Sequence, residues 1–136
     1  MLKPMKPDWT LIANATRARL LQQERGAPMV ILESFIHPAS RRRLIEPSQE
    51  KAVQATRKDH NQFARELAHL LEQEAQLDHY ASLKIFASSP FFGEIQGELG
   101  KATRKLLVAA QELDLTGFGL SELEERISQQ LALHGA

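Results

Sequence analysis

The chain has 136 residues, of which 43% are hydrophobic and 25% charged, and its 17 basic side chains balance its 17 acidic ones. This predicts a single domain over residues 1–136 and argues against a dedicated nucleic-acid protein, which carries a basic excess. The absence of cysteine excludes disulfides, thiolate metal sites and cysteine catalysis. Because no apolar run reaches the ~20 residues that span a bilayer and no signal peptide is found, we expect a cytoplasmic protein without a membrane segment.

The first three predicted elements are strands. Trp9 to Ala13 is a short apolar run with two β-branched residues, and residues 17–22 alternate partly after a tight turn. Gly26 and Pro28 then break the chain. Residues 29–36 form the third strand, whose side chains we expect to alternate regularly between its two faces.

The clearest predicted element is a long amphipathic helix after a polar segment. Its apolar positions recur at three- and four-residue spacing, which places them on one face. They are Phe63, Ala64, Leu67, Ala68, Leu71 and Ala75. The helix could begin near Ser48, or at Asp59 with Gln62 as capping-box partner. We expect residues 38–58 to be either a long loop that could be mobile or the lead-in to this helix.

Two strand–helix pairs complete the predicted fold. Residues 82–87 form a strand, after which Pro90 starts a short helix that Gly100 ends. Residues 105–110 form the last strand, and Ser121 caps the final helix. The first three strands predict an antiparallel meander, and the later ones predict right-handed parallel crossovers. The expected fold is therefore α/β (α+β mixed), a five-stranded mixed sheet with the element order βββαβαβα.

Several segments occur in a particular order and spacing. They are Trp9 through Leu20, Phe63 through Ala68, Leu83 through Ala87 before Pro90 and Gly93, and Asp114 through Thr116, with Arg43 and Glu46 in the long loop. From Trp9 to about Leu131 the chain resembles the host attachment protein family, whose members look like the middle domain of eukaryotic and archaeal peptide-chain release factors. The resemblance implies a fold similar to ribonuclease H and certain ribosomal proteins.

The resemblance does not imply peptide-release chemistry. Release factors reach the peptidyl-transferase centre with a Gly-Gly-Gln in the loop before the long helix. This chain has no Gly-Gly-Gln, and no glycine lies between Gly26 and Gly93. We therefore expect that peptide release is not its function.

Basic residues gather before and at the start of the long helix. Guanidinium groups pair with phosphate bidentately, so an arginine run with other basic residues nearby could contact ribosomal or transfer RNA. The candidate RNA- or phosphate-binding residues are Arg17, Arg19, Arg41, Arg42, Arg43, Arg57 and Lys58. The alternative is a solvated loop that binds no ligand.

No catalytic or metal-binding set emerges from the sequence. His60 could be a general base, but a histidine on an apolar stripe is more often held by a hydrogen-bond partner. A two-metal nuclease would need a carboxylate within the first strand, and only Asp8 lies at its edge. Gly100 and Lys101 lack the rest of a phosphate-binding loop. We expect no catalytic residues, no metal and no cofactor, and a binding protein rather than an enzyme.

Two functions stay open, together with the oligomeric state. The first is a non-catalytic, release-factor-like binding module of the host attachment family that contacts RNA or the ribosome through its basic loop. The second is a protein-interaction or adhesion-related factor with no nucleic-acid role. The neutral charge favours the second, as do the adjacent Phe91 and Phe92, which would mark a protein partner if exposed. A metal-dependent hydrolase is a third hypothesis.

Overall fold

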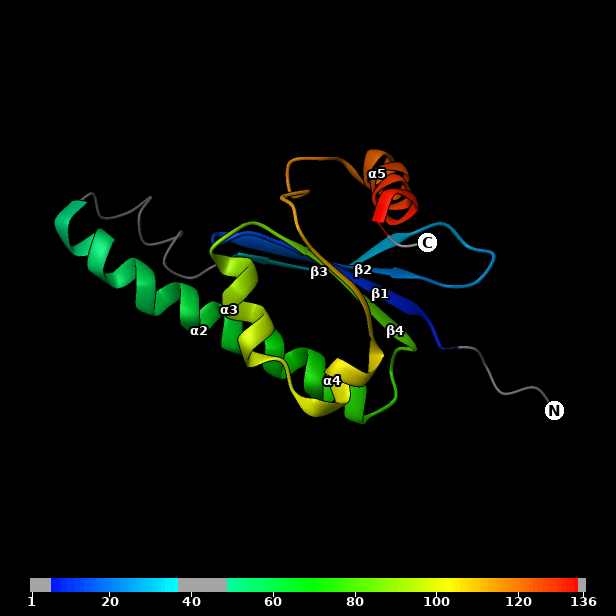
Figure 1. Ribbon diagram of the computed structural model, residues 1–136, viewed down its shortest axis with the longest axis horizontal. Helices are drawn as coiled ribbons and strands as arrows, with labels where there is room; N and C mark the ends of the chain where they lie inside the picture. The colour runs from blue at the N-terminus through cyan, green and yellow to red at the C-terminus, as the bar shows by residue number, and fades with distance from the viewer. Residues whose placement is uncertain (1–5, 37–48, 135–136) are drawn as a thin grey trace.

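The computed structural model describes the chain at residues 6–36 and 49–134, and the side chains at 6–36 and 61–132. A five-stranded sheet lies between two helical layers (Figure 1). Helices α2, α3 and α4 cover one face of the sheet and α5 covers the other. The elements are β1 (Asp8–Ala13), β2 (Arg17–Gln23), β3 (Val30–Ile36), α2 (Gln49–Gln76), β4 (Ser82–Ala87), α3 (Phe91–Glu98), α4 (Lys101–Leu106), β5 (Leu107–Glu112) and α5 (Leu120–His134).

The sheet has the mixed topology that the sequence predicts. Its strand order is β3-β2-β1-β4-β5, with β1, β2 and β3 antiparallel and β1, β4 and β5 parallel. Helix α2 precedes β4 and runs along the sheet in the opposite direction, so its N-terminal end lies at the carboxyl ends of the parallel strands. Its 28 residues span about 42 Å, whereas the six residues of β1 span about 20 Å. The start of α2 therefore extends past the sheet (Figure 1).

The larger part of the core lies between the sheet and α2. Alternate β1 side chains, Trp9 and Leu11, pack on the apolar stripe of α2, while Ile12 packs on the α5 side. The Trp9 ring stacks on Tyr80 with 4.3 Å between centroids. The Tyr80 hydroxyl donates to the Leu71 carbonyl at 2.9 Å, and burial raises the pKa of Tyr80 to about 12. The stripe predicted on the long helix is thus the main packing surface of the domain.

Helix α4 is absent from the predicted order. The expected strand over 105–110 begins only at Leu107, because the residues before it are helical. The Glu72 carboxylate of α2 accepts hydrogen bonds from the backbone N–H groups of Ala102 and Thr103, at 3.3 and 2.9 Å, and so satisfies the first turn of α4. A Cβ at Gly100 would lie 2.3 Å from Glu72 Oε1, so glycine leaves room for this carboxylate.

The structure tests the predicted starts of two helices. Helix α2 begins at Gln49, so the predicted start near Ser48 is confirmed and residues 49–58 are helical rather than a loop. Residues 37–48 lie outside the described chain. The predicted cap at Ser121 is wrong, because α5 begins at Leu120. The backbone N–H groups of Glu122 and Leu123 donate to the Gly119 carbonyl at 3.1 and 3.0 Å.

Strand β3 does not alternate regularly. Its pairing with β2 passes from Leu20 and Glu33 to Leu21 and Ile31, so Leu32 forms a bulge. The strand is therefore less regular than its sequence predicts, and it lies at one edge of the sheet.

The two adjacent phenylalanines do not form an exposed patch. Phe91 is buried, and Phe92 is half-buried against the α2-side core. Since these rings would favour the protein-partner hypothesis only if they were exposed, they do not support it.

Candidate functional site at the carboxyl ends of the parallel strands

Two segments about a hundred positions apart meet at the carboxyl ends of the parallel strands. The turn after β1 contains Asn14, and the loop after β5 contains Asp114 and Thr116. The Asn14 side-chain amide donates to Thr116 Oγ1 at 2.9 Å and to Asp114 Oδ2 at 3.4 Å. In open sheets of this kind, ligands commonly bind outside the carboxyl ends of the strands. This end of the sheet is therefore the first place to look for a site.

The polar side chains at this end also fix the backbone of their own segments. Asn14 Oδ1 accepts hydrogen bonds from the N–H groups of Thr16 and Arg17, at 2.8 and 2.9 Å, which closes the turn between β1 and β2. Asp114 Oδ1 accepts from the Thr116 N–H at 2.9 Å and from its hydroxyl at 2.6 Å. The cluster is thus a set of interlocked turns.

Asp114 stays ionised within this cluster. Its partial burial raises its pKa, but hydrogen bonds from Thr116 and Asn14, with the positive charge of Arg17, more than offset that effect. The net result is a pKa below the usual value for aspartate. A carboxylate stabilised in this way is a weak proton acceptor at neutral pH, so its geometry suits a structural role.

The structure places the two arginines of β2 in different environments. Arg17 is exposed at the start of the strand. Arg19 is half-buried, and its guanidinium donates to the carbonyls of Thr116 and Phe118, the latter at 3.0 Å. The guanidinium of Arg126 lies over the Phe118 ring in the same loop, 3.9 Å from the ring centroid, as a cation–π contact. Arg19 therefore holds the loop after β5, while Arg17 faces solvent near Asp114.

Two other sequence candidates lie in the half of α2 that begins at this end of the sheet. Arg57 and Lys58 are in the first half of α2, which begins at the carboxyl ends of the parallel strands (Figure 1). Their side chains, that of His60 and the run Arg41 to Arg43 lie outside the described residues. The fold thus brings Arg17 and the start of α2 to one end of the sheet.

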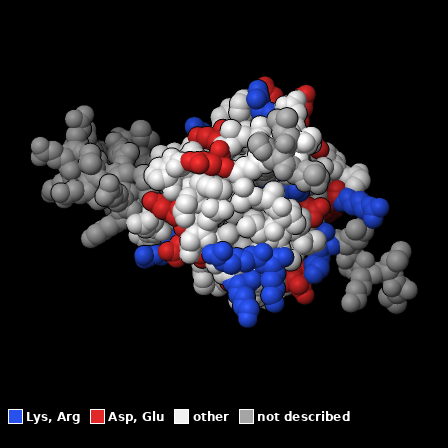
Figure 2. Space-filling model, viewed as in Figure 1, with Lys and Arg blue, Asp and Glu red and all other residues white. Residues whose placement is uncertain are grey.

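A second basic surface, on α4, was missed by the sequence prediction. Figure 2 shows Lys and Arg side chains gathered over this helix, where Lys101, Arg104 and Lys105 are exposed. Arg104 donates to the carbonyls of Leu99 and Gln96 at 3.0 and 2.8 Å, so it caps the end of α3. The spacing of the three residues signals one face only if the segment is helical, and the prediction had placed Lys105 in a strand. This surface lies at the amino ends of the parallel strands.

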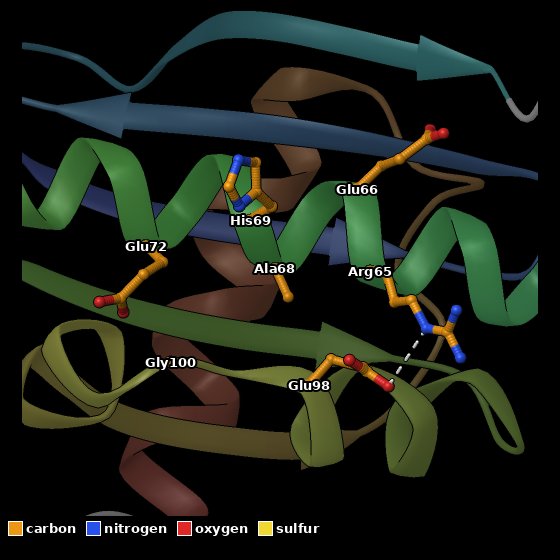
Figure 3. A pocket seen from close by; sticks show the side chains of 7 residues that line it. All are labelled: Arg65, Glu66, Ala68, His69, Glu72, Glu98 and Gly100. Carbon is orange, nitrogen blue, oxygen red and sulfur yellow. Dashed lines mark ion pairs between the residues drawn. The ribbon is translucent and has the colours of Figure 1, made fainter.

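A groove of about 480 Å³ lies between α2 and the α3–α4 connection. It is lined by Arg65, Glu66, Ala68, His69, Glu72, Glu98 and Gly100 (Figure 3). Arg65 and Glu98 form an ion pair across it at 3.6 Å, with side chains that are 68% and 43% exposed. The Glu72 carboxylate points to the start of α4 and is occupied there. The groove is therefore a surface depression with mixed charge.

The metal-dependent hypotheses find no matching arrangement in the described parts of the chain. No three histidine, aspartate or glutamate side chains there form a group that could hold a metal ion. Asp8 begins β1 and accepts a hydrogen bond from Ser82 at 2.6 Å, so it lies at the opposite end of the sheet from Asp114. These two carboxylates do not converge as a two-metal nuclease requires.

Comparison with known proteins places the chain in a family. Residues 9–127 match the family model described as "Protein required for attachment to host cells". The chain belongs to this host attachment family. The match includes both segments of the Asn14–Asp114 cluster. It confirms the resemblance on which the sequence analysis relied.

Solved structures share the fold of this host attachment family member. The archaeal translation termination factor aRF1 has a TM-score of 0.51 at 14% identity, and the match covers 94% of this chain and 40% of that one. A structure named "Archaeal protein" has a TM-score of 0.54 at 16% identity, covering 90% and 33%. The chain thus spans less than half of either structure, and identities this low show the fold alone. A search of curated proteins gives no match.

None of the described helices, which lie within residues 49–134, is long and apolar enough to span a bilayer.

Proposed function

We propose that this host attachment family member is a non-catalytic binding module that contacts RNA, in the ribosome, through basic side chains at the carboxyl ends of its parallel strands. The observation that supports this is the exposed Arg17 at the end of the sheet where α2 begins. The contact residues would be Arg17, Arg41, Arg42, Arg43, Arg57 and Lys58. Arg19 would act by positioning the loop after β5.

The path of the chain supports a single basic surface. Ile36, the last residue of β3, pairs with Arg17, so the segment with the arginine run leaves the sheet beside Arg17. Arg41 follows Ile36 by five residues, and a fully extended chain allows at most about 18 Å between their Cα atoms. The chain then enters α2, with Arg57 and Lys58 about two turns from its start. Three segments can therefore present positive charge to one phosphate backbone.

The two carboxylates with lowered pKa values support binding rather than catalysis. Glu72 and Asp114 both have lowered pKa values, and both accept hydrogen bonds from backbone N–H groups of loops or helix starts. Side chains occupied in this way stabilise the fold. Ribosomal RNA is the proposed ligand because one structure that shares the fold is a translation termination factor.

The test is RNA binding at two salt concentrations. Fluorescence anisotropy with a labelled 20-nucleotide single-stranded RNA, and co-sedimentation with ribosomes, would compare the wild type with an R41A/R42A/R43A variant. Loss of three phosphate contacts should make the negative slope of log K against log salt shallower by about 2. It should also abolish ribosome association at 150 mM salt. If the wild type binds neither probe at 50 mM salt, the proposal is wrong.

Two double variants that remove the same number of charges test whether RNA binding depends on this surface or only on the net charge of the protein. R57Q/K58Q and K101Q/K105Q each remove two positive charges, at opposite ends of the sheet. We expect the first pair to weaken RNA binding at least tenfold and the second to weaken it less than twofold. The reverse result would assign RNA binding to α4 instead.

A protein-interaction role without nucleic acid is the second candidate function. The buried Phe91 does not favour it. The observation that favours it is the exposure of apolar side chains along β3, where Val30, Ile31, Leu32 and Ile36 are each more than 40% exposed. Ribosome-free material that keeps a protein partner after ribonuclease treatment would support this candidate.

A further inference from the structure

We propose that β3 and the groove beside it bind an extended segment of another polypeptide. The segment would pair with β3 as a sixth strand, place alternate apolar side chains in the groove, and carry lysine or arginine next to them. This inference is independent of the RNA contact at the carboxyl ends of the parallel strands.

Strand β3 is an open edge with apolar side chains. It is the outermost strand of the sheet and pairs only with β2 within the described chain. Four of its seven residues are large apolar side chains at the surface, with exposures of 46% for Val30, 43% for Ile31, 44% for Leu32 and 54% for Ile36. Natural edge strands are usually protected by charged side chains, proline, bulges or a covering segment; β3 has the bulge at Leu32 and one charge, Glu33, but neither lysine nor proline. Such a strand offers unpaired backbone groups as well as apolar area.

A groove of about 350 Å³ lies on the α2 face next to this strand. Its apolar lining comes from Trp9, Leu20, Leu32 and Leu70. The Trp9 indole donates to the Gln22 side chain at 3.0 Å, which fixes the ring at the groove wall. Because side chains alternate along a strand, every second side chain of a segment paired with β3 would point to this face. An edge that provides backbone pairing, with a pocket for alternate side chains, is the arrangement that binds extended peptides.

The polar lining of the groove selects the charge of the partner. Glu33 and Glu74 contribute two carboxylates, His79 is hydrogen-bonded to Glu74, and the lining includes no lysine or arginine. A basic segment is therefore favoured over an acidic one. A second copy of the chain fits less well, because antiparallel self-pairing about the middle of β3 would place Glu33 opposite Glu33, and like charges directly opposite destabilise a sheet.

The test selects peptides without assuming a sequence. The full chain would be screened against a random decapeptide phage library, and enriched peptides titrated into ¹⁵N-labelled protein. We expect enriched peptides with apolar residues at alternate positions and lysine or arginine between them. They should shift the β3 amides and the Trp9 indole, with peptide-to-β3 amide contacts typical of strand pairing.

Two charge-reversal variants provide the matched comparison. Glu33→Lys lies on the strand, and Glu125→Lys makes the same charge change at an exposed position of α5. We expect E33K to weaken the enriched peptides at least tenfold and E125K less than twofold, with RNA binding unchanged in both. The R57Q/K58Q variant should in turn keep peptide binding, so either proposal can fail alone.

Several results would overturn the inference. These are the absence of any enriched peptide, enriched peptides that are acidic or that shift residues away from β3, and equal binding by E33K. Slow hydrogen exchange along the whole outer edge of β3 in the free chain would show that the strand is already paired. A dimer in sedimentation whose interface maps to β3 would assign the strand to self-association.

Discussion

The two ends of the sheet each hold a carboxylate with a lowered pKa, and they hold it differently. At the amino end, Glu72 connects two helices by accepting hydrogen bonds from α4, and its pKa is about 2. At the carboxyl end, Asp114 accepts hydrogen bonds mainly from Thr116 in its own loop, with a further contact from Asn14. Glu72 joins two helices that are far apart in the sequence. Asp114 closes a turn within its own loop and links that loop to Asn14 in the turn after β1.

This difference indicates where charge is available for a partner. Both ends expose cations, Lys101 and Lys105 at one and Arg17 at the other. At the amino end the exposed cations are those of the short helix α4 and Lys6, which is paired with Asp78. At the carboxyl end, Arg17 pairs with Ile36, the last residue of β3, and lies at the end of the sheet where α2 begins. Net charge alone does not distinguish the two ends, but the convergence of segments does.

The largest expected effect comes from removing the carboxylate at the amino end. Glu72→Ala leaves the N–H groups of Ala102 and Thr103 without their acceptor, and we expect the free energy of unfolding to fall by about 2 kcal/mol. Urea unfolding at pH 7 measures this. Glu66→Ala on the same helix, where the side chain is exposed, should change stability by less than about 0.5 kcal/mol. Equal effects would show that α4 does not depend on Glu72.

The stabilisation by Glu72 should depend on pH. Backbone N–H donation from Thr103 and the Gln76 amide lower its folded-state pKa from 4.5 to about 2. A group with a lowered folded pKa stabilises the fold above its unfolded pKa, and that contribution is lost as the pH falls through the folded pKa. The stability difference between wild type and E72Q should therefore shrink between about pH 5 and pH 2. A difference that stays constant over this range would contradict the assignment.

Much of the fold could be predicted from the sequence, because its signals are local. The apolar spacing from Phe63 to Ala75 identified the long helix, and short apolar runs identified the strands and their order. Helix α4 was missed because its first turn is stabilised by Glu72, about thirty positions earlier, and no local pattern records that contact. Ser121 was assigned as a cap from a local motif, but α5 begins one residue earlier, at Leu120.

The candidate site was predictable only in part, for a similar reason. The segments around Asn14 and Asp114 were both recognised, but nothing in the sequence indicated that they hydrogen-bond to each other. Arg17 and Arg19 looked equivalent, and the loop carbonyls that occupy Arg19 became visible only in the structure. The exposure of the apolar side chains of β3 was also unpredictable, because an apolar strand has the same sequence pattern at an edge or in the centre of a sheet.

A smaller effect is expected at the carboxyl end. Thr116→Val removes the hydroxyl that bonds both Asn14 and Asp114, and we expect a loss of about 1 kcal/mol in the free energy of unfolding. Ser121→Ala is the control, since Ser121 is exposed and does not cap α5, and its effect should stay below about 0.5 kcal/mol. If Ser121→Ala costs as much as Thr116→Val, the assignment of the helix start is wrong.

The smallest expected effect on stability comes from Arg17, and it reports on ligand binding. Its positive charge is one cause of the lowered pKa of Asp114, so Arg17→Gln should raise that pKa while changing stability by less than about 0.5 kcal/mol. A phosphate bound at Arg17 would neutralise the same charge and add a negative one, so RNA should also raise the pKa of Asp114 in the wild type. RNA bound over α4, at the other end of the sheet, would leave it unchanged because salt screens distant charges. Titration of the Asp114 carboxyl by NMR, with and without RNA, therefore tells which end binds.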